Sequence, residues 1–325
     1  MPLNKYPFVL LLIFGPFLSL GWGFYAHKKI NEQAVYSLPP ELFGFYKNHL
    51  NYLTERATDP DKRRYAVENE GPKHFLDADY YEKQLPLDTL PKNWFKAVEK
   101  YSLDTLQKHG IGPWNLQLMQ KQLVKAFEEK NIFRIIKLST DMGHYVADMH
   151  VPLHTTSNYN GQKTGQHGIH GLWESRLPEL FASNYNFVVG RAVYIDSVEY
   201  SIWNAFEKSH SLVDSVLNTE RRVSNLFSED KKYVIEQRGA STVKTYSREF
   251  SSKYHQELGT MVEDRMKDAM YLLSCLWYTA WVEAGMPNLE LNQGFGIPEY
   301  DSDELKEIET NYQKGSIKGR EEPNE

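Results

Sequence analysis

The amino-acid sequence predicts an all-α fold. Helical patterns of apolar side chains account for most of the chain, and prolines and glycines end these runs at lengths typical of helices. Only one run, 186–196, has the composition of an extended strand, and no second run of that kind is present to pair with it. The 325 residues contain no internal repeat and no Gly/Ser-rich linker, so one multi-helix domain is favoured over two small ones.

The expected helices are separated by polar or turn-rich segments. In chain order they span residues 26–38, 41–56, 94–109, 114–129, 132–149, 198–217 and 248–284. The first stops at Pro39-Pro40, because proline does not continue a helix. In the last, apolar side chains recur at helical spacing and indicate core packing. The tail, 291–325, is charged and poor in apolar residues, so we expect it to be flexible.

The N-terminus has the pattern of a secretory signal peptide. A lysine precedes an apolar run at 8–20, and small residues occupy the positions before Trp22. The run is short for a transmembrane helix, although an uncleaved anchor is the alternative. We therefore expect residues 1–21 to be removed. The expected product is a secreted or periplasmic protein with a catalytic domain at 22–290 and no stable membrane span.

Composition limits the partners and the covalent chemistry. The formal net charge of −6 gives no electrostatic argument for nucleic-acid binding, although a local basic groove or bound metals could offset it. Because Cys275 is the only cysteine, no internal disulfide can form, and its apolar surroundings indicate a core residue. No protein partner is predicted.

One stretch, 141–174, concentrates the residues that carry chemistry. His144 and Asp148 are four positions apart in a helical segment, so both project from one face, and His170 and Glu174 repeat this spacing. His154 follows on the loop after the first pair. Imidazole nitrogens and carboxylate oxygens are ligands of Zn²⁺, and the stretch therefore predicts a metal site. Taken alone, the first pair could equally be a hydrogen-bonded structural pair.

A longer series of residues carries a resemblance to a known family. Its members, in order, are Trp22, His27, Asp59, His74, His144, Asp148, His154, His170 and Glu174. This series resembles the ligand set of the zinc-dependent phospholipase C/P1 nuclease superfamily, whose members are secreted, mostly helical and hold three zinc ions. The match covers Trp22 to Glu174 directly, and the helices beyond it suit the fold.

The resemblance implies a separate ligand set for each of three Zn²⁺ ions. The first set is Asp59, His74, His144 and Asp148. The second is Asp148, His27 and the free amino group and carbonyl of Trp22. The third is His154, His170 and Glu174. Asp148 would bridge two ions, and Asp59 would either orient the attacking water or act only as a ligand.

The resemblance also implies the reaction, in which water activated by zinc attacks phosphorus in a phosphodiester. The motifs WGFYAH and GIHGLWESRLPE resemble bacterial zinc-dependent phospholipase C proteins, which favours a phospholipid substrate. The spacing of the early ligands resembles P1-type nucleases instead, and Asp77 matches a position that reads a base edge. We therefore expect a secreted phospholipase C-like hydrolase, with an S1/P1-type nuclease for single-stranded DNA or RNA as the alternative. A non-catalytic zinc- or phosphate-binding protein is the third hypothesis.

Overall fold

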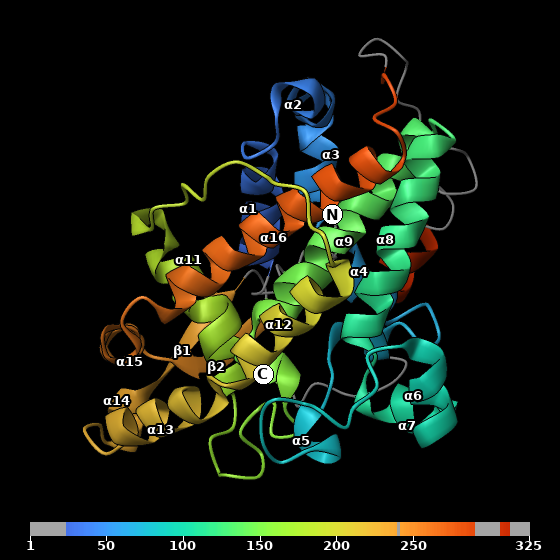
Figure 1. Cartoon of the computed structure of the whole chain (residues 1–325). Coiled ribbons are helices and arrows are strands. Elements are labelled where there is room, and N and C mark those ends of the chain that lie inside the picture. The colour runs from blue at the N-terminus through green and yellow to red at the C-terminus, as the bar shows by residue number, and fades with distance from the viewer. Residues whose placement is uncertain (1–23, 239–240, 290–305, 313–325) are drawn as a thin grey trace, which may run out of the picture.

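A computed structural model describes residues 24–238, 241–289 and 306–312, and most of these residues are helical (Figure 1). The all-α prediction is confirmed. Within the described ranges the strands are β1 (Tyr233–Arg238) and β2 (Ser241–Tyr246), which form one antiparallel pair. The run 186–196, which the sequence suggested as extended, pairs with no described strand.

The long helices lie close to their expected positions. They are α1 (Phe24–Val35), α8 (Gly112–Glu128), α9 (Ile132–His150), α12 (Val198–His210), α13 (Val213–Ser224), α15 (Arg248–Leu258) and α16 (Met261–Glu283). Short helices connect them: α2 (Pro40–Asn48), α3 (Leu50–Glu55), α4 (Asp59–Arg63), α5 (Ala78–Tyr81), α6 (Trp94–Tyr101), α7 (Leu103–His109), α10 (Ile169–Gly171), α11 (Leu177–Phe181) and α14 (Glu229–Lys232). The 3₁₀ turns are η1 (Gly71–His74), η2 (Pro152–Thr155) and η4 (Ala182–Asn184), and η3 (Leu172–Arg176) is a π-helical turn.

Two long helices predicted as continuous are each divided by one residue with a positive φ angle. Ser102, with φ of 68°, separates α6 from α7, and its hydroxyl accepts a hydrogen bond from the backbone of Thr105. Gly259, with φ of 64°, separates α15 from α16. A change of direction at one residue leaves the apolar pattern on both sides intact, so periodicity alone does not reveal it.

The core is organised around α9, against which α1, α8 and α16 pack (Figure 1). Tyr46 of α2 stacks on Trp277 of α16 with ring centroids 4.7 Å apart, and both side chains are fully buried. The hydroxyl of Tyr46 lies 2.8 Å from that of Ser139 on α9. Cys275 is buried, as its apolar surroundings predicted. These contacts fix the helices that carry the first candidate ligands.

The close approach of α1 to α9 depends on Gly143. A Cβ atom built at Gly143 would lie 1.7 Å from Oδ1 of Asn31, which is fully buried and donates hydrogen bonds to Leu53 and Thr140 carbonyls. We expect Gly143→Ala to destabilise the fold by about 1–3 kcal/mol, as overpacked cores do. Because His27 and His144 flank this contact, metal affinity should fall as well. Denaturant unfolding measures the first effect.

The control for this prediction is Gly71→Ala, because a Cβ atom at Gly71 meets nothing within 4 Å. Its free energy of unfolding should match that of the wild type within about 0.5 kcal/mol. Equal losses of stability in the two variants would contradict the steric explanation.

The β-hairpin was not predicted from the sequence. It lies with α13, α14 and α15 at one end of the molecule, at the lower left of Figure 1. Arg176 of η3 makes two hydrogen bonds to the carboxylate of Glu236 on β1, at 2.9 and 2.6 Å, and Tyr246 of β2 donates to the carbonyl of His167 at 3.1 Å. The hairpin therefore supports the segment that carries the last two candidate ligands.

Part of the C-terminal tail is ordered. Residues 306–312 form a helix in which Ile308 is buried, Glu309 pairs with Lys62 at 3.0 Å, and Tyr312 packs edge-on against Tyr65. The sequence predicted a flexible tail, and these contacts attach this part of it beside α4. The rest of the tail and residues 1–21, which the sequence predicted to be a signal peptide, lie outside the described residues. Among the described helices, none has the length and apolar character needed to cross a membrane.

Candidate metal centre

Eight imidazole and carboxylate side chains from distant parts of the chain meet at one place. They are His27 of α1, Asp61 of α4, His74 of η1, His144 and Asp148 of α9, His154 of η2, His170 of α10 and Glu174 of η3. They form four overlapping groups of three, in each of which the potential ligand atoms lie within 4.8 Å of one another. Seven of the side chains are at most 12% exposed, and Asp61 is 27% exposed.

Local structure explains how α9 presents its two ligands. Asn131 caps the start of the helix by accepting a hydrogen bond from the backbone of Arg134, and Pro152 lies just after its end. His144 and Asp148 are one turn apart on the buried face. The ring of His27 stacks on that of His144, with centroids 4.0 Å apart and planes 17° apart. The packing of α1 on α9 thus brings two imidazoles together.

The first part of the cluster surrounds Asp148. Its Oδ2 lies 2.9 Å from Nδ1 of His74 and 3.4 Å from Nε2 of His144. Oδ1 of Asp61 lies 3.7 and 3.5 Å from the same two nitrogens. The other oxygen of Asp148 faces His27, whose Nε2 is 3.6 Å from Oδ1. Asp148 therefore directs one oxygen at each of two groups of ligands.

Glu174 joins the rest of the cluster in the same way. Its Oε1 lies 3.3 Å from Nε2 of His27, and its Oε2 lies 3.1 Å from Nε2 of His154 and 2.6 Å from Nε2 of His170. A π-helical turn carries Glu174, and such turns occur frequently at functional sites. The two carboxylates Asp148 and Glu174 thus connect three neighbouring groups of ligand atoms into one row.

Backbone carbonyls determine which nitrogen of three imidazoles faces the cluster. The Nδ1–H groups of His144, His154 and His170 donate to the carbonyls of Ala57, His74 and Tyr159 at 2.9, 2.6 and 3.3 Å, respectively. A neutral imidazole held in this way presents its Nε2 lone pair to a carboxylate oxygen. The lone pair of the nitrogen and that of the oxygen then repel each other. A cation between them removes the repulsion, and metal-binding histidines typically donate their other N–H to a carbonyl or carboxylate.

Four of the distances around His27 and His144 match those between ligands of one metal ion, whereas the pairs of Glu174 with His154 and His170, at 3.1 and 2.6 Å, and of Asp148 with His74, at 2.9 Å, are closer together. Two ligands at ~2.0–2.2 Å from a tetrahedral Zn²⁺ are about 3.3–3.6 Å apart. The distances from His27 to Glu174 and Asp148, 3.3 and 3.6 Å, lie in this range, as do those from His144 to Asp148 and Asp61, 3.4 and 3.5 Å. The residues present therefore fit divalent metal ions.

Electrostatics also favour bound cations. Burial raises the pKa of Asp148 to about 8 and lowers the pKa of His74 well below its usual value. Burial alone would also raise the pKa of Asp61, but the neighbouring His144 and His74 hold it well below its usual range. With a pKa of about 8, Asp148 is largely protonated at neutral pH in the absence of metal, and a divalent ion would supply the positive charge that keeps it ionised.

The structure brings together seven of the nine predicted ligands and adds one. Trp22 lies outside the described residues. Asp59 is buried but belongs to none of the four groups, and its Oδ2 is 3.5 Å from Arg56. Asp61 lies in the cluster instead. Two residues apart on α4, the two carboxylates point in different directions, and sequence spacing does not reveal which one faces His74.

This placement predicts different effects for two otherwise similar substitutions. We expect Asp61→Asn to weaken binding of at least one metal ion by more than about tenfold, because the removed charge faces His74 and His144. Asp59→Asn should leave metal affinity within about threefold of the wild type. Equilibrium dialysis against buffered zinc measures both. A larger loss with Asp59→Asn would restore Asp59 as the ligand.

Asp77, the predicted substrate-binding residue, lies at the start of α5 and is 5% exposed. Its carboxylate accepts a hydrogen bond from Nδ1 of His109 at 3.2 Å. The ring of Tyr80 stacks on His109 with centroids 3.5 Å apart and planes 11° apart, and Tyr80 is 53% exposed. Leu76 donates its backbone N–H to the carbonyl of His154, which connects this aromatic segment to the candidate metal centre.

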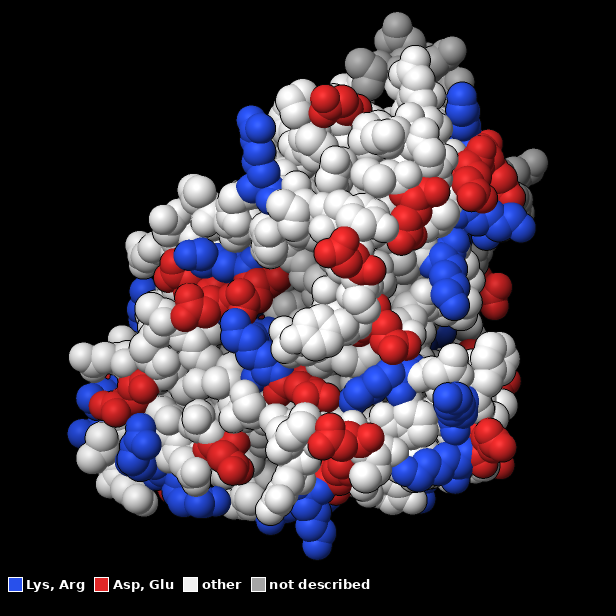
Figure 2. Space-filling view, viewed as in Figure 1, with Lys and Arg blue, Asp and Glu red and all other residues white. Residues whose placement is uncertain are grey.

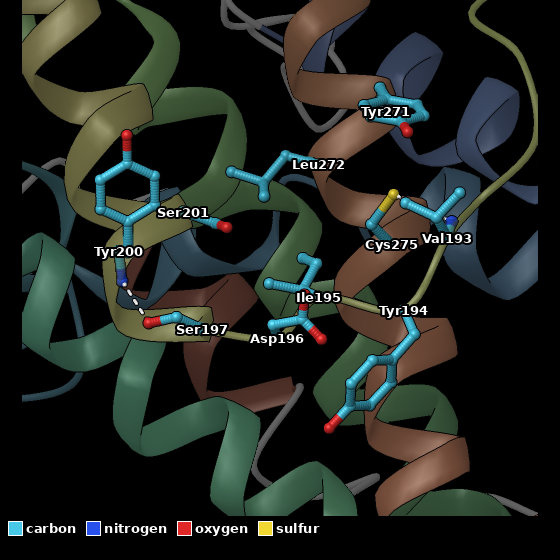
Figure 3. A pocket seen from close by; sticks show the side chains of 10 residues that line it. All are labelled: Val193, Tyr194, Ile195, Asp196, Ser197, Tyr200, Ser201, Tyr271, Leu272 and Cys275. Carbon is cyan, nitrogen blue, oxygen red and sulfur yellow. Dashed lines mark hydrogen bonds between the residues drawn. The ribbon is translucent and has the colours of Figure 1, made fainter.

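A separate surface pocket contains none of the candidate ligands. Its volume is about 390 Å³, and it lies between α16 and the segment 193–201 (Figure 3). Tyr194, Tyr200, Tyr271 and Leu272 contribute to its mostly apolar lining. With one carboxylate, that of Asp196, and no histidine, this pocket does not have the composition of a metal site.

Charge on the surface is mixed. On the face in Figure 2, acidic and basic side chains are interspersed, so this face carries no continuous basic track. Compared with models of known protein families, the chain matches none, and no curated protein matches its sequence. Function is therefore inferred from the site itself.

Proposed function

We propose that the protein is an exported, zinc-dependent phosphodiester hydrolase of the phospholipase C type. The observation that carries this proposal is the row of buried ligand groups linked by Asp148 and Glu174. Zinc ions bound close together supply activated water and stabilise negative charge on a phosphoryl group. The proposed centre holds about three Zn²⁺ ions, as the resemblance implies.

The side chains have distinct roles in this proposal. Asp148 and Glu174 would each contribute to two neighbouring ligand groups, because each directs one oxygen to either side. The carbonyl-bound histidines keep one tautomer and present Nε2 without reorganisation. Asp61, the most exposed member of the cluster, marks the side open to solvent. Asp59, to which the resemblance gave the attacking water, pairs with Arg56 outside the ligand groups, and no role in the reaction is proposed for it.

A nuclease is the second candidate function, and one observation favours it. The half-exposed ring of Tyr80, stacked on His109 beside Asp77, is a surface on which a nucleobase can stack. The net charge of −6 and the mixed charges in Figure 2 favour the phospholipid instead, because nucleic-acid binding depends on clustered basic side chains.

The discriminating experiment uses the purified protein beginning at Trp22. Hydrolysis of phosphatidylcholine vesicles and of single-stranded DNA and RNA is followed in parallel, with and without chelator. Release of phosphorylated head group that chelator abolishes supports the proposal. Chelator-sensitive release of nucleotides supports the nuclease instead. Zinc binding without either activity would favour a non-catalytic, metal- or phosphate-binding role.

Two histidine variants serve as the matched test of the site. We expect His154→Ala to abolish hydrolysis of whichever substrate is cleaved. His255→Ala removes an imidazole that contacts Tyr185 and belongs to no ligand group, and it should retain activity. Equal loss in both variants would show that general destabilisation, and not loss of a ligand, explains the result.

A further inference from the structure

A compact loop connects the ligands His154 and His170. Asn160 lies in this loop, and its side chain is 3% exposed. Its Oδ1 accepts hydrogen bonds from the backbone N–H groups of Gly168, at 3.0 Å, and His170, at 3.2 Å. One buried amide oxygen thus holds the backbone at the start of α10, the short helix that carries His170.

The residue before Asn160 holds the imidazole itself. The carbonyl of Tyr159 accepts from Nδ1 of His170 at 3.3 Å, and the Tyr159 ring packs edge-on against the imidazole. Both the backbone and the ring of His170 therefore depend on the position of residues 159 and 160. Held in this way, His170 points its Nε2 at Oε2 of Glu174, 2.6 Å away.

The loop is anchored independently of His170. Asn158 accepts from the backbone of Lys163 at 2.8 Å and donates to the hydroxyl of Thr164 at 3.1 Å. The side chain of Gln166 donates to the carbonyl of Leu217 on α13. The side chain of Asn160 thus connects this ordered loop to the backbone of the ligand residue His170.

We propose that Asn160 is a positioning residue for the metal ligand His170. It contacts neither metal nor substrate, and it acts by fixing the start of α10 so that Nε2 of His170 meets Glu174 in the geometry for binding. This inference rests on the proposed metal centre. A leucine of similar size at this position would leave two partly buried N–H groups without their acceptor.

Three variants test the inference. Asn160→Ala removes the acceptor, Asn160→Asp keeps an acceptor oxygen, and Asn158→Ala loosens the same loop without touching His170. We expect Asn160→Ala to weaken one zinc site by about 10–100-fold, the range for residues that orient metal ligands. Asn160→Asp and Asn158→Ala should stay within about threefold of the wild type. Equilibrium dialysis at several zinc activities gives the affinities.

A second readout requires no turnover. In the zinc-loaded protein, the ¹⁵N shifts of the His170 ring report whether Nδ1 carries the proton while Nε2 binds the metal. We expect this single form in the wild type and in Asn158→Ala, and a mixture of ring states in Asn160→Ala. Unchanged zinc affinity and ring shifts in Asn160→Ala would overturn the inference, as would an equal loss of affinity in Asn158→Ala.

The outcomes separate this inference from the proposed function. Zinc binding that depends on Asn160 in a protein with no hydrolytic activity would leave the positioning role intact and reject the enzyme. Hydrolytic activity with a zinc affinity that does not depend on Asn160 would reject the positioning role and leave the proposed enzyme intact. A wild-type protein that binds no zinc would overturn both.

Discussion

Asp148→Asn is expected to reduce phosphodiester hydrolysis by at least about 10³-fold, equivalent to about 4 kcal/mol of transition-state stabilisation. Asp148 directs Oδ2 toward His74 and Oδ1 toward His27, so the carboxylate serves two ligand groups. Asparagine keeps the shape but offers one oxygen and an amide nitrogen that does not bind metal. We therefore also expect the variant to lose two of its bound metal ions. Steady-state rates and metal content, measured on the same preparation, test both.

The control for this substitution is Asp264→Asn on α16, which removes an exposed carboxylate hydrogen-bonded to Thr260. It should retain rate and metal content. Far-ultraviolet circular dichroism of Asp148→Asn should show an intact helical fold, because the amide fills the same volume. A folded Asp148→Asn protein with wild-type metal content and rate would contradict the assigned role of Asp148.

Removal of the metals is expected to lower the melting temperature by at least about 10 °C. A metal at a hundred times its dissociation constant stabilises the folded state by ~2.7 kcal/mol per site. In a domain of this size each kcal/mol shifts the melting temperature by ~2–4 °C. The metal-free cluster must also hold Asp148, Glu174 and Asp61 close together without the cations between them. Differential scanning calorimetry with and without chelator measures the shift.

The matched control for chelation is the same chelator already saturated with zinc, which should leave the melting temperature unchanged. Addition of excess zinc to the stripped protein should restore the original transition. An unchanged melting temperature after verified removal of metal would mean that the cluster is stable without cations, and it would weigh against a metal centre.

The sequence alone predicted those parts of the candidate site that depend only on residues close together in the chain. Two pairs at i, i+4 spacing, His144 with Asp148 and His170 with Glu174, depend only on the helical repeat, and both are present. Their meeting with His27 depends on α1 packing against α9, which no local pattern describes. Only the family resemblance placed those residues in one series.

The sequence could not predict which of Asp59 and Asp61 faces the cluster. The resemblance placed the ligand at Asp59, whereas the structure places Asp61 in the cluster. The direction of each carboxylate is set by how α4 lies against α9. Arg63 of α4 pairs with Asp141 of α9 at 3.0 Å, a contact between residues far apart in the chain. That contact fixes the rotation of α4, and with it which aspartate faces the cluster.

The missed elements have a similar explanation. The hairpin Tyr233–Tyr246 lies in a polar segment, and its position is stabilised by long-range contacts such as that between Arg176 and Glu236. The ordered helix in the tail depends on burial of Ile308 and on the pair between Glu309 and Lys62. Tertiary contacts therefore override weak local preference in both places.

The number of metal ions bound per chain tests the central claim most directly. The protein beginning at Trp22 would be purified without chelator or added metal and analysed by inductively coupled plasma mass spectrometry against an exact protein concentration. We expect about three zinc ions per chain, all removed by chelator together with the hydrolytic activity. A protein that contains no stoichiometric metal and takes up none from buffered zinc would contradict the account.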